Sequence, residues 1–304
     1  MHGFLLIDKP AGITSHDIVR QIRRKLHIKR VGHGGTLDPM ATGLVPVAIG
    51  DATRLLEFYS DSEKGYSSTM RLGVTTDSQD AEGEVVATAD WQSVTPDTVE
   101  QTLTSMQGDL DQVPPMFSAL KKDGTPLYKL ARQGIEVERK ARRITIRSIA
   151  MTACELPSVS FDVVCSKGTY IRTLAHDVGQ SLGCGAHLTA LRRFRHGPYE
   201  IAAAIRLEDF VAASDEQAAA MLIPLLEMLP DLPLGRLSDE AIPRLLNGIP
   251  PQSDEVDFDA DCVGGDIVRL VAGGRLLAVA EFDPARTREK RGDFILSRVF
   301  TCGQ

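Results

Sequence analysis

The chain of 304 residues contains 43% hydrophobic and 25% charged residues, the ordinary range for a globular protein that buries one large core or two unequal ones. Its start has no basic segment, and its apolar run is far shorter than that of a signal peptide or a membrane span, so we expect a cytoplasmic protein without membrane helices. Its five cysteines, an odd number without any C-x-x-C pair, indicate neither a disulfide framework nor a cysteine-rich zinc site.

Charge is distributed unevenly along the chain. The formal net charge is −7, but residues 206–266 hold 14 acidic and 3 basic residues, so the remainder is net positive. Residues 121–147 hold 9 basic and 3 acidic residues, and residues 20–30 hold 6 basic and no acidic ones. Such stripes permit RNA binding, because Lys and Arg neutralise phosphates. The alternative, that they are solvated helix faces, is the commoner explanation of charge patterning alone.

The first part of the chain predicts short strands alternating with helices. Ser15 is a candidate N-cap for a helix that carries Ile18, Ile22 and Leu26 on one face. A glycine-rich loop is expected at residues 32–43. The other expected elements here are strands at residues 4–7, 44–49 and 66–74 and a short helix at 54–59.

Two Thr-Pro pairs punctuate the middle of the chain. Thr95-Pro96 and Thr125-Pro126 each predict an N-cap followed by proline at the first helical position, and the second helix, which is basic, should end near Gly134. Strands are expected at 144–153 and 159–165, a helix at 169–182 and a linker at 228–235. We therefore expect a large domain over residues 1–230 and a small β domain over 236–304.

The densest functional signal is the segment from Gly32 to Gly43, in which four glycines surround one carboxylate, Asp38, followed by a proline. It lacks the G-x-x-x-x-G-K-[ST] pattern of a phosphate loop, so nucleoside triphosphates are not implied. The chain contains no G-x-S-x-G elbow, which excludes the usual serine hydrolase.

Several further motifs occur in order between residues 4 and 200. They are Lys9-Pro10-Ala11-Gly12-Ile13-Thr14-Ser15, Lys64-Gly65-Tyr66, Ser166-Lys167-Gly168-Thr169-Tyr170-Ile171-Arg172 and Leu191-Arg192-Arg193. Together with the segment around Asp38, continued by residues 44–50, which resembles the family's catalytic motif, they make the chain resemble the TruB family of tRNA pseudouridine synthases.

This resemblance implies the pseudouridine synthase fold, a mixed α+β architecture with a central, mostly antiparallel sheet flanked by helices and a small C-terminal PUA-like β domain. It implies that Asp38 is the catalytic carboxylate, assisted by Tyr66 and Arg172, and that the T-loop uridine of tRNA is flipped out and isomerised without a cofactor. Whether Asp38 attacks the ribose, attacks the base or promotes elimination stays open.

The resemblance also implies residues that contact RNA. Around the pocket they are His33, Lys9, Tyr170, Leu191 and Arg193. An insertion at residues 114–143, here called the clamp, is expected to grip the T arm, with phosphate contacts from Lys121, Lys122, Lys129, Arg132, Arg142 and Arg143.

No metal site is expected. The acidic clusters Asp77, Asp80, Glu82 and Asp257, Asp259, Asp261 lack the spacing of a calcium loop and are interpreted as solvated loops. The expected partner is the T arm of tRNA, with no obligate protein partner and a monomeric chain.

Three other functions fit part of the pattern. A guide-directed pseudouridylase shares the Asp38 motif but works inside a ribonucleoprotein, and the complete clamp favours the stand-alone enzyme. An RNA-folding factor would unfold and refold tRNA without chemistry, although a pure binder has no use for the carboxylate, and an enzyme of this family can have both roles. A carboxylate glycosidase would need a second acid, which the sequence does not identify.

Overall fold

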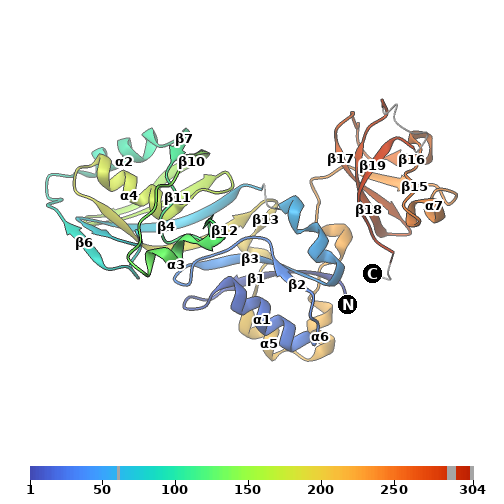
Figure 1. Ribbon diagram of the computed structural model, residues 1–304, viewed down its shortest axis with the longest axis horizontal. Coiled ribbons are helices and arrows are strands. Elements are labelled where there is room, and N and C mark those ends of the chain that lie inside the picture. Colours follow the sequence, from blue (N-terminus) through green and yellow to red (C-terminus); the bar gives the residue numbers. More distant parts are fainter. Residues whose placement is uncertain (60–61, 286–291, 302–304) are drawn as a thin grey trace.

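The computed structural model describes residues 1–59, 62–285 and 292–301. Within these ranges a large sheet carries most of the chain, and a smaller strand-rich unit lies at one end of it (Figure 1). The large sheet has ten strands, ordered β14-β1-β3-β12-β4-β11-β10-β7, with β2 paired to β3 and β13 to β12. Two pairings, β1 with β14 and β3 with β12, are parallel and the others are antiparallel. The predicted mixed fold with a mostly antiparallel sheet is confirmed.

The strands of this sheet are β1 (Gly3–Lys9), β2 (Val31–His33), β3 (Thr42–Ile49), β4 (Lys64–Leu72), β7 (Gly108–Gln112), β10 (Arg142–Glu155), β11 (Ser158–Cys165), β12 (Ala186–His196), β13 (Tyr199–Glu200) and β14 (Ile205–Arg206). The associated helices are α1 (Ser15–Leu26), α2 (Pro96–Ser105), α4 (Ile171–Ser181), α5 (Leu207–Ala212) and α6 (Asp215–Ala220), with 3₁₀ helices at Gly50–Tyr59, Ile201–Ala203 and Leu225–Glu227. Helices α1 and α5 lie together by β1, while α2 and α4 cover the half built from β10 and β12 (Figure 1).

Helix α1 forms where its apolar face predicts it, but its cap differs from the expectation. Thr14 is the N-cap, since its hydroxyl accepts from the Asp17 backbone N–H at 3.1 Å and the Asp17 carboxylate accepts from the Thr14 N–H in return. Ser15 is instead buried, and its hydroxyl accepts from the Leu37 N–H at 2.8 Å. The serine thus ties the helix to the catalytic-motif loop.

The basic stripe at residues 20–30 is engaged largely within the protein. Arg20 pairs with Asp17, Arg30 with Asp51, and Arg23 donates to the Val31 carbonyl at 2.8 Å. These contacts favour the alternative that this stripe is a solvated and internally paired helix face.

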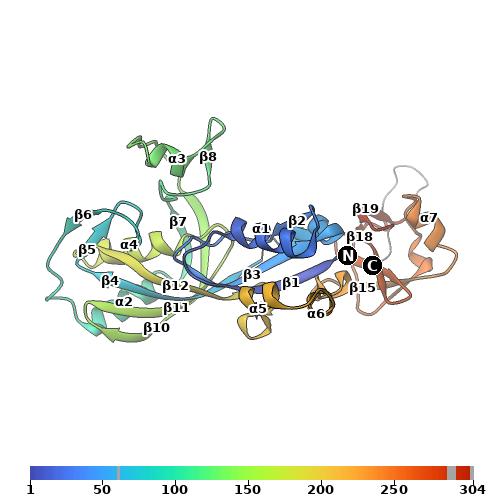
Figure 2. The same ribbon diagram turned by 90° about the horizontal axis from the view of Figure 1, so that it is seen from below.

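The clamp projects from the large sheet, as Figure 2 shows for α3 and β8. It contains β8 (Lys121–Lys122), β9 (Thr125–Pro126) and α3 (Leu127–Ala131). The expected N-cap at Thr125 is wrong, because Thr125 pairs with Lys122 in a two-stranded turn and Pro126 occupies the cap position without a side-chain bond.

The Thr95 cap of α2 is confirmed. A second small hairpin joins β5 (Val74–Thr76) to β6 (Val85–Thr88), so β4 ends at Leu72 before it.

The C-terminal unit has the sheet order β16-β15-β17-β18-β19. Its elements are β15 (Leu234–Leu237), α7 (Ile242–Leu246), the 3₁₀ helix Ser253–Glu255, β16 (Val256–Phe258), β17 (Ile267–Ala272), β18 (Arg275–Phe282) and β19 (Phe294–Val299). Phe258, Phe282 and Phe294 pack against one another in its core. This confirms a small strand-rich domain at the C-terminal end.

The segment before that domain is packed rather than free. Met228 and Leu229 are buried in a cluster that also contains Phe4 of β1 and Val279 of β18. Arg54 adds a hydrogen bond from its guanidinium to the Val299 carbonyl at 2.7 Å. Because apolar side chains of both units share this cluster, its burial holds them together.

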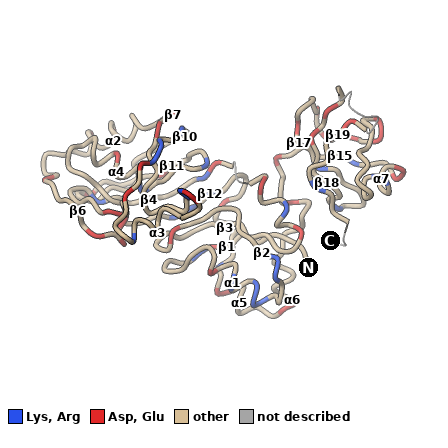
Figure 3. The backbone as a smooth tube through the Cα atoms, in the orientation of Figure 1, with Lys and Arg blue, Asp and Glu red and all other residues tan. Residues whose placement is uncertain are grey.

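Figure 3 shows Lys and Arg on α1 and near β7 and β10, and many Asp and Glu along the C-terminal unit. Among residues 1–59, 62–285 and 292–301, no helix is both long and apolar enough to cross a membrane.

Candidate active site

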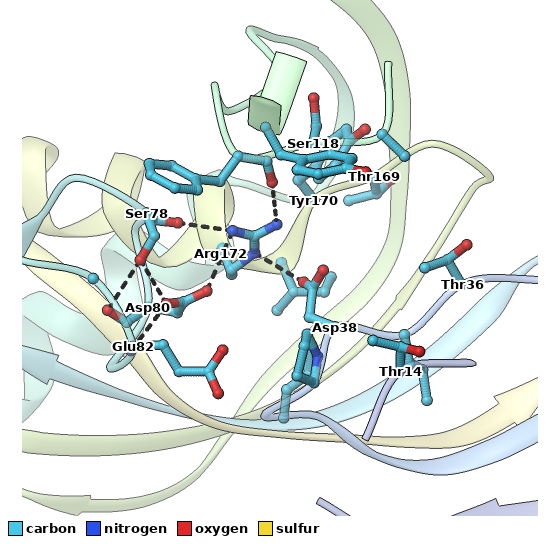
Figure 4. Close-up of a pocket in the computed structure, with 18 of the residues that line it drawn as sticks. Thr14, Thr36, Asp38, Ser78, Asp80, Glu82, Ser118, Thr169, Tyr170 and Arg172 are labelled. Carbon is cyan, nitrogen blue, oxygen red and sulfur yellow. Dashed lines mark hydrogen bonds and ion pairs between the residues drawn. The ribbon is translucent and has the colours of Figure 1, made fainter. Parts of the chain in front are cut away.

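A cavity of about 1060 Å³ opens between the large sheet and the clamp. Most of its lining comes from the glycine-rich loop with Asp38, an acidic loop at residues 77–84, the clamp, and the chain leading into α4, and strands β4 and β12 add further residues. Figure 4 shows Asp38 and Arg172 pointing toward each other in direct contact at its wall, with Asp80 next to the arginine and Tyr170 and Ser118 on the clamp side. The resemblance therefore named residues that the fold brings together from distant parts of the chain.

The loop that carries Asp38 is held by the Lys9 to Ser15 segment. The Gly12 N–H donates to the Pro39 carbonyl at 2.8 Å, and the Lys9 ammonium donates to the carbonyls of Pro39 at 3.1 Å and Ala41 at 2.6 Å. Lys9 is fully buried, and burial lowers its pKa to about 8. The structure places Lys9 behind the loop and outside the cavity lining, where it supports the backbone that presents Asp38.

A parallel contact between β3 and β12 holds the loop from its other side. Gly43 pairs with Arg193 and has φ +104°, and a Cβ there would lie 2.3 Å from the Arg193 carbonyl oxygen. Glycine is therefore required for the strands to approach. The buried Arg193 guanidinium donates to the carbonyls of Leu44 at 2.7 Å and Gly35 at 3.0 Å. Arg193 lines the cavity floor and also fixes the glycine-rich loop.

Arg172 is the centre of the site's ion pairs. Its Nε lies 2.9 Å from Asp38 Oδ2 and its Nη1 lies 3.2 Å from Asp80 Oδ2. Nη1 also donates to the Ser78 carbonyl at 2.9 Å, and Nη2 donates to the Phe117 carbonyl in the clamp at 2.8 Å. With the side chain 5% exposed and partners on every nitrogen, the guanidinium is fixed in one orientation.

Asp80 lines the cavity and pairs with Arg172, a placement that the sequence interpretation missed. Its expected place in a solvated loop is wrong, because its side chain is 5% exposed, accepts from Ser78 Oγ at 2.6 Å and pairs with Arg172. The loop turns tightly at Gly83, where a Cβ would lie 2.2 Å from Ser78 Oγ. A glycine directly after the acidic residues is a sequence signal for this tight turn. Nothing in the local sequence, however, indicates that Asp80 pairs with Arg172, 92 residues away.

Burial raises the pKa of Asp38, while Arg172 opposes this shift and the nearby Asp80 charge adds to it. The carboxylate is 37% exposed toward the cavity, so a bound molecule can reach it. A carboxylate that is partly desolvated and oriented by one guanidinium can act as a nucleophile or as a base.

Tyr66 and Leu191 form the cavity wall on neighbouring strands. Tyr66 of β4 pairs with Arg193 of β12, and Leu191 lies two residues before that pair. Burial raises the pKa of Tyr66, so its phenol is neutral near pH 7. Tyr170 lines the cavity as the N-cap of α4. His33 ends β2 outside the lining residues. Among the residues that the structure describes, its buried Nδ1 has no hydrogen-bond partner, and burial lowers its pKa.

The predicted phosphate-binding residues occupy different environments. Arg132 lines the cavity, and its guanidinium lies over the Tyr128 ring, 5.6 Å from the ring centre. Arg143 lies at the outer sheet edge, 3.6 Å from Asp109 and 3.5 Å from Asp111. The remaining members are exposed outside the cavity lining and are Lys121, Lys122, Lys129 and Arg142.

In the part of the chain that the structure describes, no three His, Cys, Asp or Glu side chains are arranged to hold a metal ion.

Comparison with known proteins identifies the family. The N-terminal domain model of TruB family pseudouridylate synthases matches residues 23–171, and the tRNA pseudouridylate synthase B C-terminal domain model matches residues 172–230. A tRNA pseudouridine synthase B of Syntrophotalea carbinolica is 50% identical over 100% of this chain and 99% of its own length. One of Geobacter sulfurreducens is 45% identical over 92% of this chain and 93% of its own length.

Solved structures agree with this assignment. A chain of a Cbf5-Nop10-Gar1 complex superposes with a TM-score of 0.76 at 28% identity, covering 98% of this chain and 84% of that one. A chain of an H/ACA RNP bound to a substrate RNA containing 2'-deoxyuridine also gives 0.76, at 26% identity and the same coverage. Family models over more than half of the chain, and relatives at 45–50% identity along nearly all of it, show that this chain belongs to the TruB family of pseudouridylate synthases.

Proposed function

We propose that this chain isomerises the T-loop uridine of tRNA to pseudouridine, with Asp38 as the catalytic carboxylate. The observation that carries the proposal is the contact of 2.9 Å between Asp38 and Arg172 at the wall of a cavity large enough for a nucleotide. The names of the curated relatives, tRNA pseudouridine synthase B, supply the substrate class.

The reaction matches what the site can do. The bond from N1 of uracil to the ribose must break, the base must turn while it is held, and C5 must bond to the same ribose carbon. C5 then loses its proton while N1 gains one, so atoms and charges balance without a redox cofactor or a phosphate donor. Each of the three possible roles of Asp38 begins with its ionised form, which Arg172 favours against burial.

The cavity suits a base that has left its stack. A uridine within a folded RNA loop is extruded before an enzyme reaches its ring. Tyr66 offers a ring face to the extruded base, and its neutral phenol is suited to proton exchange at C5. Leu191 closes the apolar side of the wall. His33, adjacent to the loop, is proposed to occupy the space that the base vacates.

We propose that the clamp binds the T arm through phosphates. Reversing the charge of Lys121, Lys122 and Lys129 together should weaken tRNA binding. It should also reduce the slope of the logarithm of the affinity against the logarithm of the salt concentration by about one per lost phosphate contact. Reversal of Arg143 should have less effect, since Asp109 and Asp111 already partly neutralise it. Equal affinities and slopes for wild type and the triple variant would refute the clamp's role.

The chain is proposed to act as a cytoplasmic monomer without a guide RNA or protein partner, because its own clamp supplies basic residues beside the cavity. Residues 1–230 are proposed as the catalytic domain and 236–304 as a PUA-like β domain. Holding and releasing the T arm would also let the protein act as a tRNA folding chaperone.

The test is position-mapped conversion of uridine in an unmodified tRNA transcript, with wild type and Asp38→Asn side by side and no guide RNA or added cofactor. Pseudouridine at the T-loop uridine with wild type alone supports the proposal. Tight binding of tRNA by folded wild-type protein without product would favour the folding-factor or guide-dependent alternatives.

A further inference from the structure

The clamp leaves the large sheet and returns to it at one pair of residues. Strand β7 ends at Gln112 and β10 begins at Arg142, and these two residues are cross-strand partners. Gln112 is 4% exposed, although it bears a polar amide. A buried amide needs hydrogen-bond partners, so its contacts show what it is used for.

Both ends of the Gln112 amide bind the backbone of one residue, Tyr170. The Tyr170 N–H donates to Gln112 Oε1 at 2.8 Å, and Gln112 Nε2 donates to the Tyr170 carbonyl at 3.1 Å. Because the backbone N–H can only donate and the carbonyl can only accept, this pair of bonds fixes the orientation of the amide. The side chain thus joins the root of the clamp to one point of the chain 58 residues later.

That point is the start of the helix that carries the arginine. Tyr170 is the N-cap of α4, and no side chain within the helix provides its cap bond. The Tyr170 carbonyl also accepts the first helical bond, from Leu174 at 3.0 Å. Arg172 follows two residues after Tyr170, so the position of this first turn determines where its guanidinium lies.

A second contact joins the same two parts of the molecule. Arg172 Nη2 donates to the carbonyl of Phe117, which lies five residues after Gln112 at the base of the clamp. The guanidinium is therefore held directly by the clamp, and its helix is held by Gln112. Gln112 itself is not among the residues that line the cavity at Asp38.

We propose that Gln112 is a positioning residue for the isomerisation, which fixes the first turn of α4 against the root of the clamp so that Arg172 presents Nε to Asp38. The proposal rests on the function proposed above. It assigns to the clamp, besides any RNA contacts, a role in setting the geometry of the catalytic ion pair.

The main test is Gln112→Met, which keeps the length of the side chain and removes both bonds. We expect the single-turnover rate at saturating enzyme to fall about 10- to 30-fold, the effect of two ordinary hydrogen bonds, while Kd for tRNA changes less than about twofold. The acid limb of the pH–rate profile should move to higher pH, because Arg172 lowers the pKa of Asp38 and would be displaced. Gln112→Glu retains an acceptor for the Tyr170 N–H and should recover part of the rate.

Two controls separate positioning from general destabilisation. Ser160→Ala removes a side-chain hydrogen bond of 2.9 Å to Thr69 in the same sheet, away from the cavity, and should leave both rate and pH profile unchanged. In a double-mutant cycle with Arg172→Lys, the loss from Gln112→Met should be much smaller than in the wild-type background, because Gln112 acts through Arg172.

A readout without turnover distinguishes failure of this proposal from failure of the proposed function. The Arg172 Nε–H resonance, assigned by its absence in Arg172→Lys, should shift in Gln112→Met and stay in place in Ser160→Ala. If wild type makes no pseudouridine but the resonance shifts, the function is wrong and the positioning holds. If wild type is active and folded Gln112→Met keeps its rate, acid limb and resonance, Gln112 has no positioning role. Should Gln112→Met fail to fold, the same measurements on Gln112→Glu decide, with unchanged values overturning the proposal.

Discussion

Replacing Arg172 by lysine tests how much of the site depends on the shape of a guanidinium rather than on its charge. The arginine holds four acceptors at once: two carboxylates and two carbonyls, at 2.8 to 3.2 Å. A lysine ammonium is a compact charge that cannot span Asp38, Asp80 and the clamp together. We therefore expect the lysine to keep some contacts and to lose the oriented bond from Nε to Asp38.

The size of the effect follows from that one bond. A hydrogen bond involving charged groups contributes about 1.5–3 kcal/mol. At about 1.36 kcal/mol for each factor of ten, its loss slows the chemical step about 10- to 160-fold. Binding of tRNA should change little, because the affinity of such complexes comes mainly from phosphate contacts. The acid limb of the pH–rate profile should move upward, since the charge of the lysine remains but the oriented hydrogen bond that also lowers the pKa of Asp38 is gone.

The assay is single-turnover conversion of a tRNA transcript at saturating enzyme from acidic to neutral pH, corrected for the folded fraction. Arg206→Lys is the matched control, because Arg206 also pairs with two carboxylates, Glu208 and Asp209, but is 65% exposed and remote from the cavity. A rate for Arg172→Lys within about twofold of wild type, or a loss explained entirely by weaker binding, would show that the oriented contact is unnecessary.

Three further changes test the site and its support. Asp38→Asn should raise the free energy of unfolding at pH 7, because burial raises the pKa of Asp38 above 3.8 and so disfavours its ionised form. In urea unfolding, this gain in stability should shrink as the pH falls through the raised pKa. A gain that stays constant with pH would contradict this origin. Burial lowers the pKa of His196 from 6.5 to about 2, so below pH 6.5 protonation of the unfolded chain should destabilise wild type by up to about 1.4 kcal/mol per pH unit. In urea unfolding, the free energy of unfolding of His196→Gln should therefore fall less steeply with decreasing pH than that of wild type. Equal pH dependences for the two proteins would contradict this prediction. Gly43→Ala should destabilise the fold by about 3 kcal/mol or more in chemical denaturation, because its Cβ would lie 2.3 Å from the Arg193 carbonyl oxygen. Gly34→Ala is the control and should destabilise the fold by less than about 1 kcal/mol, because the nearest contact of its Cβ would be at 3.5 Å. Similar losses of stability in the two variants would refute the steric argument.

Local patterns predicted the elements that are determined locally. The apolar face of α1 and the Thr95-Pro96 start of α2 are short-range signals, and both helices form where these signals lie. The cap of α1 moved by one residue because Thr14 and Ser15 are both good caps, and the choice depends on Leu37, which needs the Ser15 hydroxyl. A competing contact also explains why Thr125 is not an N-cap: its backbone pairs with Lys122 in a two-stranded turn instead of starting the helix.

The sequence by itself determined the family, the Asp38 motif and the residues Tyr66 and Arg172, because each lies within a continuous stretch whose residue types can be recognised without knowing the fold. Tertiary structure alone decided the partners of these residues. Asp80 reaches Arg172 across 92 positions, and Gln112 reaches Tyr170 across 58. Such contacts depend on how strands pair and where a loop turns, and no local pattern encodes them. The residue type of an Asp or Gln does not reveal whether its side chain is solvated or buried, so only the fold shows that Asp80 contacts Arg172 and that Gln112 binds the start of the helix that carries it.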